Sequence, residues 1–167
     1  MEDLSVKVLS LTAVVLLSAC GPKDGPAFKL EGSLTSVLDL GYDHVWLDNS
    51  ESDFSVRFAR IQGEGENTPL KVTVTLLPGE LPGPNVTWDL AETLPNGQQR
   101  GVLSRNVLNE AVIMFPEILR GKLTMFQTPM AIETGAPASG EFNITFVTGI
   151  MPANGRTIFG TYSAKVP

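Results

Sequence analysis

Alternating apolar residues are the feature that most limits how this chain can fold. Three segments place a large apolar side chain at every second position: Phe54, Val56 and Phe58; Leu70, Val72, Val74 and Leu76; and Phe142, Ile144 and Phe146. Successive side chains of a β-strand point to opposite sides of the sheet, so this period gives one apolar and one polar face. The alternation therefore predicts strands that each cover one side of a core.

Weaker patterns of the same kind fill most of the remaining chain. The further strand candidates are residues 28–34, 36–40, 43–47, 86–90, 102–108, 121–126 and 157–166. Between them lie turns rich in Gly, Pro and Asn, at residues 63–67, 78–85, 95–97 and 152–155. Gly and Asn adopt positive φ easily and Pro cannot donate to a sheet ladder, so these stretches suit chain reversals. Residues 109–115 fit either a short helix that ends before Pro116 or an irregular loop.

Short strands joined by such turns favour antiparallel pairing over parallel strands with crossover helices. We therefore predict an all-β fold, an antiparallel β-sandwich or small barrel of about eight to ten strands. The predicted unit is a single β-rich domain over residues 27–167. A sandwich and a barrel produce the same alternation, so both stay open at this point.

A different pattern occupies the N-terminal end of the chain. Residues 8–19 are apolar apart from Ser10, Thr12 and Ser18. A membrane-spanning helix needs about 20 apolar residues, so this run has the length of a signal-peptide core rather than of a span. It ends in Leu17-Ser18-Ala19-Cys20, which contains the only cysteine of the chain.

This tetrapeptide resembles the lipobox of bacterial lipoproteins, in which a peptidase cuts before the cysteine and the thiol carries a diacylglyceryl group. The resemblance implies a cleaved signal peptide over residues 1–19, cleavage between Ala19 and Cys20, and membrane attachment through the lipid on Cys20. Residues 20–26 would then be the lipidated cysteine and a flexible tether. By the same resemblance, Gly21 in place of an aspartate implies the outer membrane, with the domain periplasmic or surface-facing.

Charge and thiol content narrow the possible partners. The formal net charge of −6 gives no basic footprint for nucleic acid, so no nucleic-acid partner is expected. With its single cysteine lipidated, the domain would have no thiol for a disulfide, a metal or nucleophilic catalysis.

Two groups of polar residues contain side-chain types that are used in catalysis or metal binding. His44, the only histidine, follows Asp43, but no serine lies in a Gly-x-Ser-x-Gly turn, so we interpret His44 as a surface or turn residue. The segment Asp48–Asp53 concentrates oxygen atoms yet lacks the glycine and distal glutamate of a calcium loop. We interpret it as a solvated turn, with a cation site as the alternative. We expect no catalytic residue, no metal and no cofactor.

Aromatic residues give the candidate binding site. Trp88 shares the parity of Val86 and Leu90 and is expected in the core. Trp46 has the parity opposite to its apolar neighbours, so Trp46 with Tyr42 is the candidate ligand-binding pair. Core packing is the alternative for both.

The functional expectation follows from the anchor and from the lack of a catalytic motif. We expect a lipid-anchored envelope protein that is not an enzyme and acts as an accessory or assembly factor through binding another envelope protein. The alternative is a small-ligand module for a glycan or a lipid.

Overall fold

The structure is a computed structural model that describes residues 30–127 and 136–165. Ala19, Cys20 and the segments 1–19 and 20–26 lie outside the described residues. The described part contains a 3₁₀ turn, η1 (Ser33–Ser36), and no α-helix. Its strands are β1 (His44–Asn49), β2 (Asp53–Gln62), β3 (Gly65–Thr75), β4 (Thr87–Asp89), β5 (Gly101–Asn106), β6 (Ile113–Met114), β7 (Ile118–Gln127), β8 (Pro137–Phe146) and β9 (Thr157–Lys165). The all-β prediction is confirmed.

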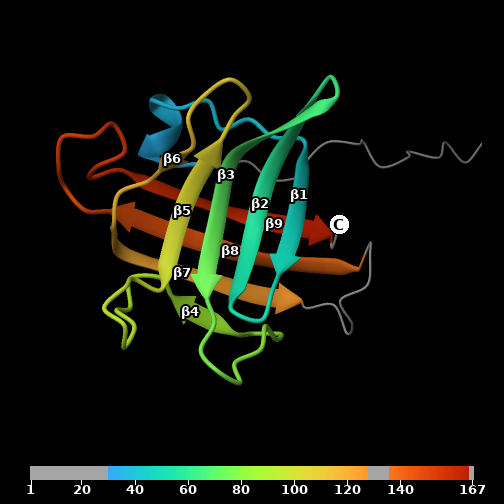
Figure 1. Cartoon of the computed structure of the whole chain (residues 1–167), viewed down its shortest axis with the longest axis vertical. Helices are drawn as coiled ribbons and strands as arrows, with labels where there is room; N and C mark the ends of the chain where they lie inside the picture. Colours follow the sequence, from blue (N-terminus) through green and yellow to red (C-terminus); the bar gives the residue numbers. More distant parts are fainter. Residues whose placement is uncertain (1–29, 128–135, 166–167) are drawn as a thin grey trace, which may run out of the picture.

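The strands form one nine-stranded sheet in the order β4-β7-β8-β9-β1-β2-β3-β5-β6. The neighbours are antiparallel except β1 and β9, which run parallel and are in register only at Trp46 and Lys165. In Figure 1, β1, β2, β3 and β5 lie side by side in front, and β7, β8 and β9 cross behind them at a steep angle. The sheet is not closed, because its end strands β4 and β6 pair with other strands on one side only.

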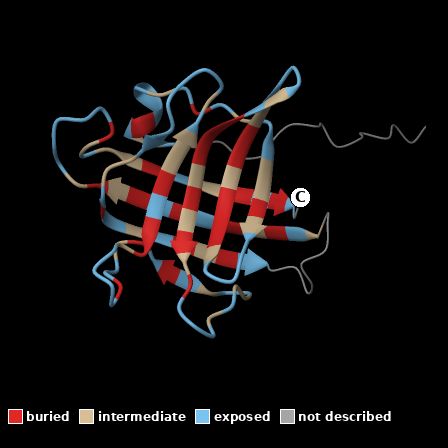
Figure 2. Ribbon diagram, in the orientation of Figure 1, coloured by how far each residue is buried: buried red, intermediate tan, exposed pale blue. Residues whose placement is uncertain are grey.

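The core lies between these two groups of strands. The ring of Phe58 in β2 meets the ring of Phe142 in β8 at a centroid distance of 5.7 Å. Phe54 in β2 stacks on Trp88 in β4 at 5.4 Å, and Trp88 is 1% exposed, which confirms its expected core position. Figure 2 shows buried positions alternating with exposed or intermediate ones along β8, and buried and intermediate positions along most of β2 and β3. The period of two thus buries one face of each layer and leaves the other face outward.

Two of the expected strands are wrong. The described residues of these segments, 30–34 and 36–40, contribute only one isolated bridge, between Glu31 and Phe159 of β9. Thr35 and Ser36 donate side-chain hydrogen bonds to the carbonyls of Gly32 and Ser33, which closes the η1 turn. Leu34 is nevertheless fully buried. The apolar pattern therefore correctly predicted that Leu34 is buried. Local hydrogen bonds from Ser and Thr side chains take the place of hydrogen bonds to a neighbouring strand.

Two connections are defined more closely by the structure. Of the two alternatives for residues 109–115, the irregular loop holds over most of the segment: a turn with Asn109 at a φ of 65° precedes the two-residue strand β6, which pairs with β5. The turn expected over residues 63–67 is shorter, because Gly65 already pairs with Gln62. Glu66 therefore belongs to β3, and this places its carboxylate on the outward face of the sheet near Arg57.

The buried Arg100 links the segments on either side of β4 through hydrogen bonds. Arg100 is 7% exposed, and its guanidinium donates hydrogen bonds to Glu92, at 2.7 Å, and to Glu80. The indole of Trp88 also donates to Glu80, at 3.0 Å. Burial by itself raises the pKa of Glu80, but the amide of Leu77 and the Arg100 guanidinium outweigh it, so the pKa is lowered. This carboxylate is held ionised next to the core.

Candidate functional site

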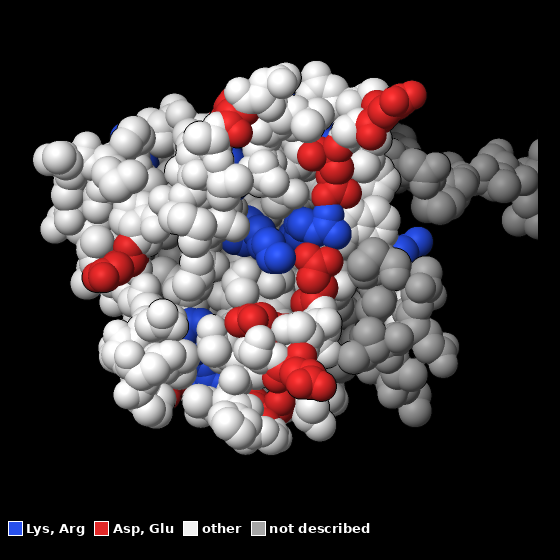
Figure 3. All heavy atoms as spheres, in the orientation of Figure 1, with Lys and Arg blue, Asp and Glu red and all other residues white. Residues whose placement is uncertain are grey.

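The outward side of β1, β2 and β3 carries a cluster of charged side chains, which we call the polar face: Asp48, Arg57, Glu66 and Lys71. Arg57 lies opposite Trp46 of β1 and opposite Lys71 of β3 in the ladder. Its neighbours in sequence, Val56 and Phe58, point the other way and are fully buried. Figure 3 shows basic and acidic side chains gathered in the middle of this face. The alternation that builds the core therefore also brings these charges together.

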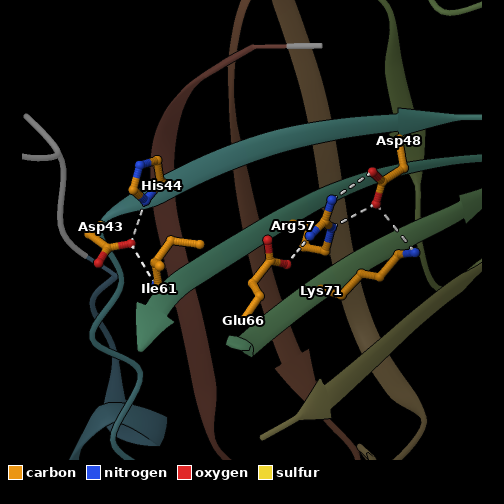
Figure 4. Close-up of polar contacts among 7 residues, drawn as sticks. All are labelled: Asp43, His44, Asp48, Arg57, Ile61, Glu66 and Lys71. Atoms are coloured by element: carbon orange, nitrogen blue, oxygen red, sulfur yellow. Dashed lines mark hydrogen bonds and ion pairs between the residues drawn. The ribbon is translucent and has the colours of Figure 1, made fainter. Parts of the chain in front are cut away.

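Arg57 is the centre of the polar face (Figure 4). Its Nε and Nη2 donate to the two carboxylate oxygens of Asp48 at 3.0 and 3.1 Å. Its Nη1 donates to Glu66. The ammonium of Lys71 lies 3.5 Å from Asp48. A two-pronged arginine–carboxylate contact fixes both groups in orientation as well as position.

Partial burial and neighbouring charges act against each other at this cluster. The side chains of Arg57 and Asp48 are 21% and 32% exposed. Burial alone raises the pKa of Asp48, but the hydrogen bond and charge of Arg57 and the charge of Lys71 outweigh it, so the pKa is lowered. Burial likewise works against the charged form of Arg57, while Asp48 and Glu66 raise its pKa. Both groups therefore stay charged at neutral pH.

A hollow of about 460 Å³ adjoins the polar face. Polar side chains supply most of its lining: Asp48, Asn49, Ser50, Asp53, Ser55, Lys71, Thr73, Thr75 and Ser104, with Val102 and Met114 as the apolar members. The hydroxyls of Ser55 and Thr73 lie 3.0 Å apart, and Thr75 donates to Asp53 at 3.3 Å. This lining offers both donors and acceptors to a polar ligand.

The segment Asp48–Asp53 forms the β1–β2 hairpin. The amide of Ser50 donates to the carbonyl of Asp53 at 2.8 Å, and the amide of Asp53 donates to the Ser50 hydroxyl at 2.9 Å. The Asp48 carboxylate is directed to Arg57 and Lys71. Over residues 30–127 and 136–165, no group of three or more metal-ligating side chains is present.

Asp43 and His44 form a polar pair at the start of β1 (Figure 4). The Asp43 Oδ1 lies 2.5 Å from Nδ1 of His44 and also accepts the amide of Ile61 at 3.2 Å. Burial works to raise the pKa of Asp43, but the hydrogen bonds from His44 and Ile61 prevail and lower it. The imidazole stacks on Trp46 at 5.4 Å. Within the described ranges, no serine or threonine hydroxyl is hydrogen-bonded to His44.

The structure does not bring the two predicted binding aromatics together. Tyr42 is partly buried against the core, with its ring edge-on to Phe58 at 5.0 Å. Burial raises the pKa of its hydroxyl. Trp46 instead lies on the outward side of β1, between His44 and the polar face. Trp46 thus lies on the outer surface of the sheet, whereas Tyr42 packs against the core.

Sequence reasoning missed the polar face itself. Its signal was present in the strand pattern, because Arg57 and Lys71 occupy polar positions between buried apolar residues. What the pattern lacked was the register that sets these two residues opposite each other.

A comparison with protein families, with curated proteins and with solved structures finds no match for this chain. Among the described residues, no helix has the length and apolar character needed to cross a membrane.

Proposed function

We propose that this chain is a lipid-anchored cell-envelope protein whose β-domain works by binding another envelope protein rather than by catalysis. The anchor rests on the lipobox-like residues Leu17-Ser18-Ala19-Cys20, with attachment to the outer membrane through lipid on Cys20 and a tether over residues 20–26. In this proposal the domain is an accessory or assembly factor of an envelope complex. We favour a β-sandwich over a barrel, because the two groups of strands cross steeply and no ladder joins β4 to β6.

The observation that carries the binding proposal is the fixed geometry of Arg57. Asp48 and Glu66 hold the Arg57 guanidinium in one orientation, and the Arg57 side chain stays 21% exposed, so a partner can reach it. Charges already fixed in place lose little conformational entropy on binding and give a partner electrostatic selectivity. Arginine and tryptophan are also the residues that most often dominate protein interfaces, and Trp46 lies opposite Arg57.

The test is capture of the full chain from envelope that has been solubilised gently, followed by mass spectrometry of its N-terminus and of any companion. We expect an acylated Cys20 at the N-terminus and a companion in stoichiometric amount. Arg57→Gln should lose the companion. Arg60→Gln is the matched control, since Arg60 lies on the same strand and also makes a two-pronged pair, with Asp39 at 3.0 and 3.1 Å.

Three results would contradict parts of the proposal. An unprocessed Met1 would remove the anchor, and a lipidated protein without a companion would remove the assembly role. Equal loss of the companion in both arginine variants would show that the polar face is not the binding surface.

A small-ligand module for a glycan or a lipid is the second candidate, because the hollow beside Lys71 is lined mainly by hydroxyl, amide and carboxylate groups. Such groups suit the hydroxyls of a glycan more than the apolar chains of a lipid. Glycan titration of the full chain separates this candidate from the first. If Trp46→Ala binds every tested glycan as the parent chain does, Trp46 is not part of the site.

A further inference from the structure

The back of the molecule carries a second hollow, on the outward side of β4, β7 and β8. Its volume is about 340 Å³, and it is lined by Asp89, Arg120, Gly121, Lys122 and Asn143. These residues belong to the group of strands that lies behind the polar face (Figure 1). The two hollows have no lining residue in common.

The ladder brings the polar groups of this hollow together. Lys122 is the central residue: it lies opposite Asp89 of β4 on one side and opposite Asn143 of β8 on the other. A register shift between Ile118 and Arg120 leaves Arg120 exposed on the same strand as Lys122. One strand thus presents two cations to the hollow, with an amide on the next strand.

Neither cation is paired with a carboxylate in the part of the chain that the structure describes. Over residues 30–127 and 136–165, neither Arg120 nor Lys122 forms an ion pair. Among the described residues, the one side-chain hydrogen bond of Arg120 runs from Nε to the Thr145 hydroxyl at 3.4 Å, which leaves the ends of the guanidinium available. This contrasts with Arg57, whose guanidinium donates to two carboxylates.

The carboxylate of Asp89 determines which anion fits. Its Oδ1 accepts the amide of Ala91 at 3.0 Å, and this hydrogen bond leaves Oδ2 as an acceptor. An anion with no donor would be repelled by this carboxylate. A phosphate ester that also carries hydroxyl groups would satisfy all the groups: Arg120 and Lys122 on the phosphate, and Asp89 on a hydroxyl.

We propose that this hollow binds a phosphate group carried on a polyol, such as a glycerol phosphate. The phosphate oxygens accept hydrogen bonds from Arg120, Lys122 and the amide nitrogen of Asn143, and a neighbouring hydroxyl donates to Asp89. This chemistry occurs both in the headgroup of a phospholipid and in a free phosphorylated polyol. The proposal depends neither on the lipid anchor nor on the polar face.

The experiment is a titration of the full chain in neutral detergent with glycerol 3-phosphate, observed through the NMR amide signals of Gly121 and Asn143. We expect saturable shifts at these two signals. Lys122→Gln should weaken binding by about tenfold or more, because it removes one charge-assisted hydrogen bond. Lys165→Gln is the control, since Lys165 is an exposed cation outside the hollow.

Further probes test the role of the Asp89 carboxylate and the source of the ligand. Inorganic sulfate, which lacks the hydroxyls, should bind more weakly than glycerol 3-phosphate, and Asp89→Asn should reduce that difference. Dihexanoyl phosphatidylglycerol presents a glycerol phosphate as a diester at a micelle surface. Tighter binding of this lipid supports a headgroup as the source, and tighter binding of glycerol 3-phosphate supports a free phosphorylated polyol.

The absence of saturable shifts would overturn the proposal, as would equal affinity in the parent chain and in Lys122→Gln. Thermal unfolding of each variant checks that the loss is not a loss of fold. Because Lys122 is exposed, we expect its replacement to leave the unfolding midpoint unchanged.

Discussion

Replacing Arg100 by methionine should destabilise the domain far more than replacing Arg60 by methionine. Both arginines contact carboxylates through their guanidinium groups. The side chain of Arg100 is 8% exposed, and that of Arg60 is 38% exposed. Methionine keeps much of the aliphatic volume of arginine. The comparison therefore measures how burial changes the contribution of the ion pairs to the free energy of unfolding.

The expected magnitudes follow from how exposed the partners are. Removing one member of a fully buried ion pair costs about 3 to 5 kcal/mol. Glu80 and Glu92 are 26% and 45% exposed, so water screens part of that loss. We expect a loss of about 2 to 3 kcal/mol for Arg100→Met, between the buried and the exposed limits. For Arg60→Met, whose partner Asp39 is 70% exposed, we expect less than about 1 kcal/mol.

The assay is urea unfolding of the full chain in neutral detergent, observed through tryptophan fluorescence at pH 7 and at lower pH. The folded-state pKa of Glu80 lies below its ordinary value of 4.5. Its stabilising contribution is therefore fully present above pH 4.5 and is lost as the pH falls through the lowered folded pKa. The gap in unfolding free energy between the parent chain and Arg100→Met should accordingly narrow in acid.

Two outcomes would refute this reasoning. If both arginine variants lose the same unfolding free energy at pH 7, burial does not determine how much these ion pairs stabilise the domain. If the difference in unfolding free energy between the parent chain and Arg100→Met stays constant from pH 7 into the acid range, the destabilisation comes from packing and not from the Glu80 charge.

Three further predictions concern other parts of the domain. Gly140→Ala should lower the unfolding free energy by about 2 kcal/mol, because the new methyl group would overlap a backbone carbonyl of β7. Gly83→Ala is the control, since its methyl group would meet only a side-chain atom of Val86, at 3.3 Å; equal urea midpoints would contradict the argument. The hydrogen bonds from Arg60, the amide of Gly41 and nearby arginine charges lower the pKa of Asp39 to about 2. In Arg60→Gln an NMR titration should find that pKa shifted part of the way back toward 3.8, and an unchanged pKa would count against the pairing. Trp46→Ala should change the unfolding free energy by less than about 1 kcal/mol, since Trp46 lies outside the core cluster; a large loss measured in urea would place it in the core after all.

The sequence predicted the regular strands better than the connections. Phe54, Val56 and Phe58 alternate over a long strand, where many residues repeat the same signal, and β2 was found there. Residues 28–34 and 36–40 carry a similar apolar pattern, yet Leu34 reaches the core from a 3₁₀ turn. Apolar spacing reports burial, and over a few residues a turn can bury a side chain as well as a strand can.

The candidate site was the least predictable part. Trp46 was singled out because its parity opposes that of its neighbours, and it does lie outward. Tyr42 has the same parity, but it precedes β1, where the strand alternation no longer holds, and it packs on Phe58. Arg57 drew no attention because a single outward arginine in a strand is ordinary until its partners are known.

Local chemistry along the sequence determined the strand class and the inward-facing residues, because the two-residue period of a strand is a property of the backbone itself. Tertiary structure alone decided the strand order and register, which depend on packing between distant segments. Register set Arg57 between Trp46 and Lys71, and Lys122 between Asp89 and Asn143. Both proposed sites are consequences of pairing between strands, whereas the core that supports them is a consequence of alternation within each strand.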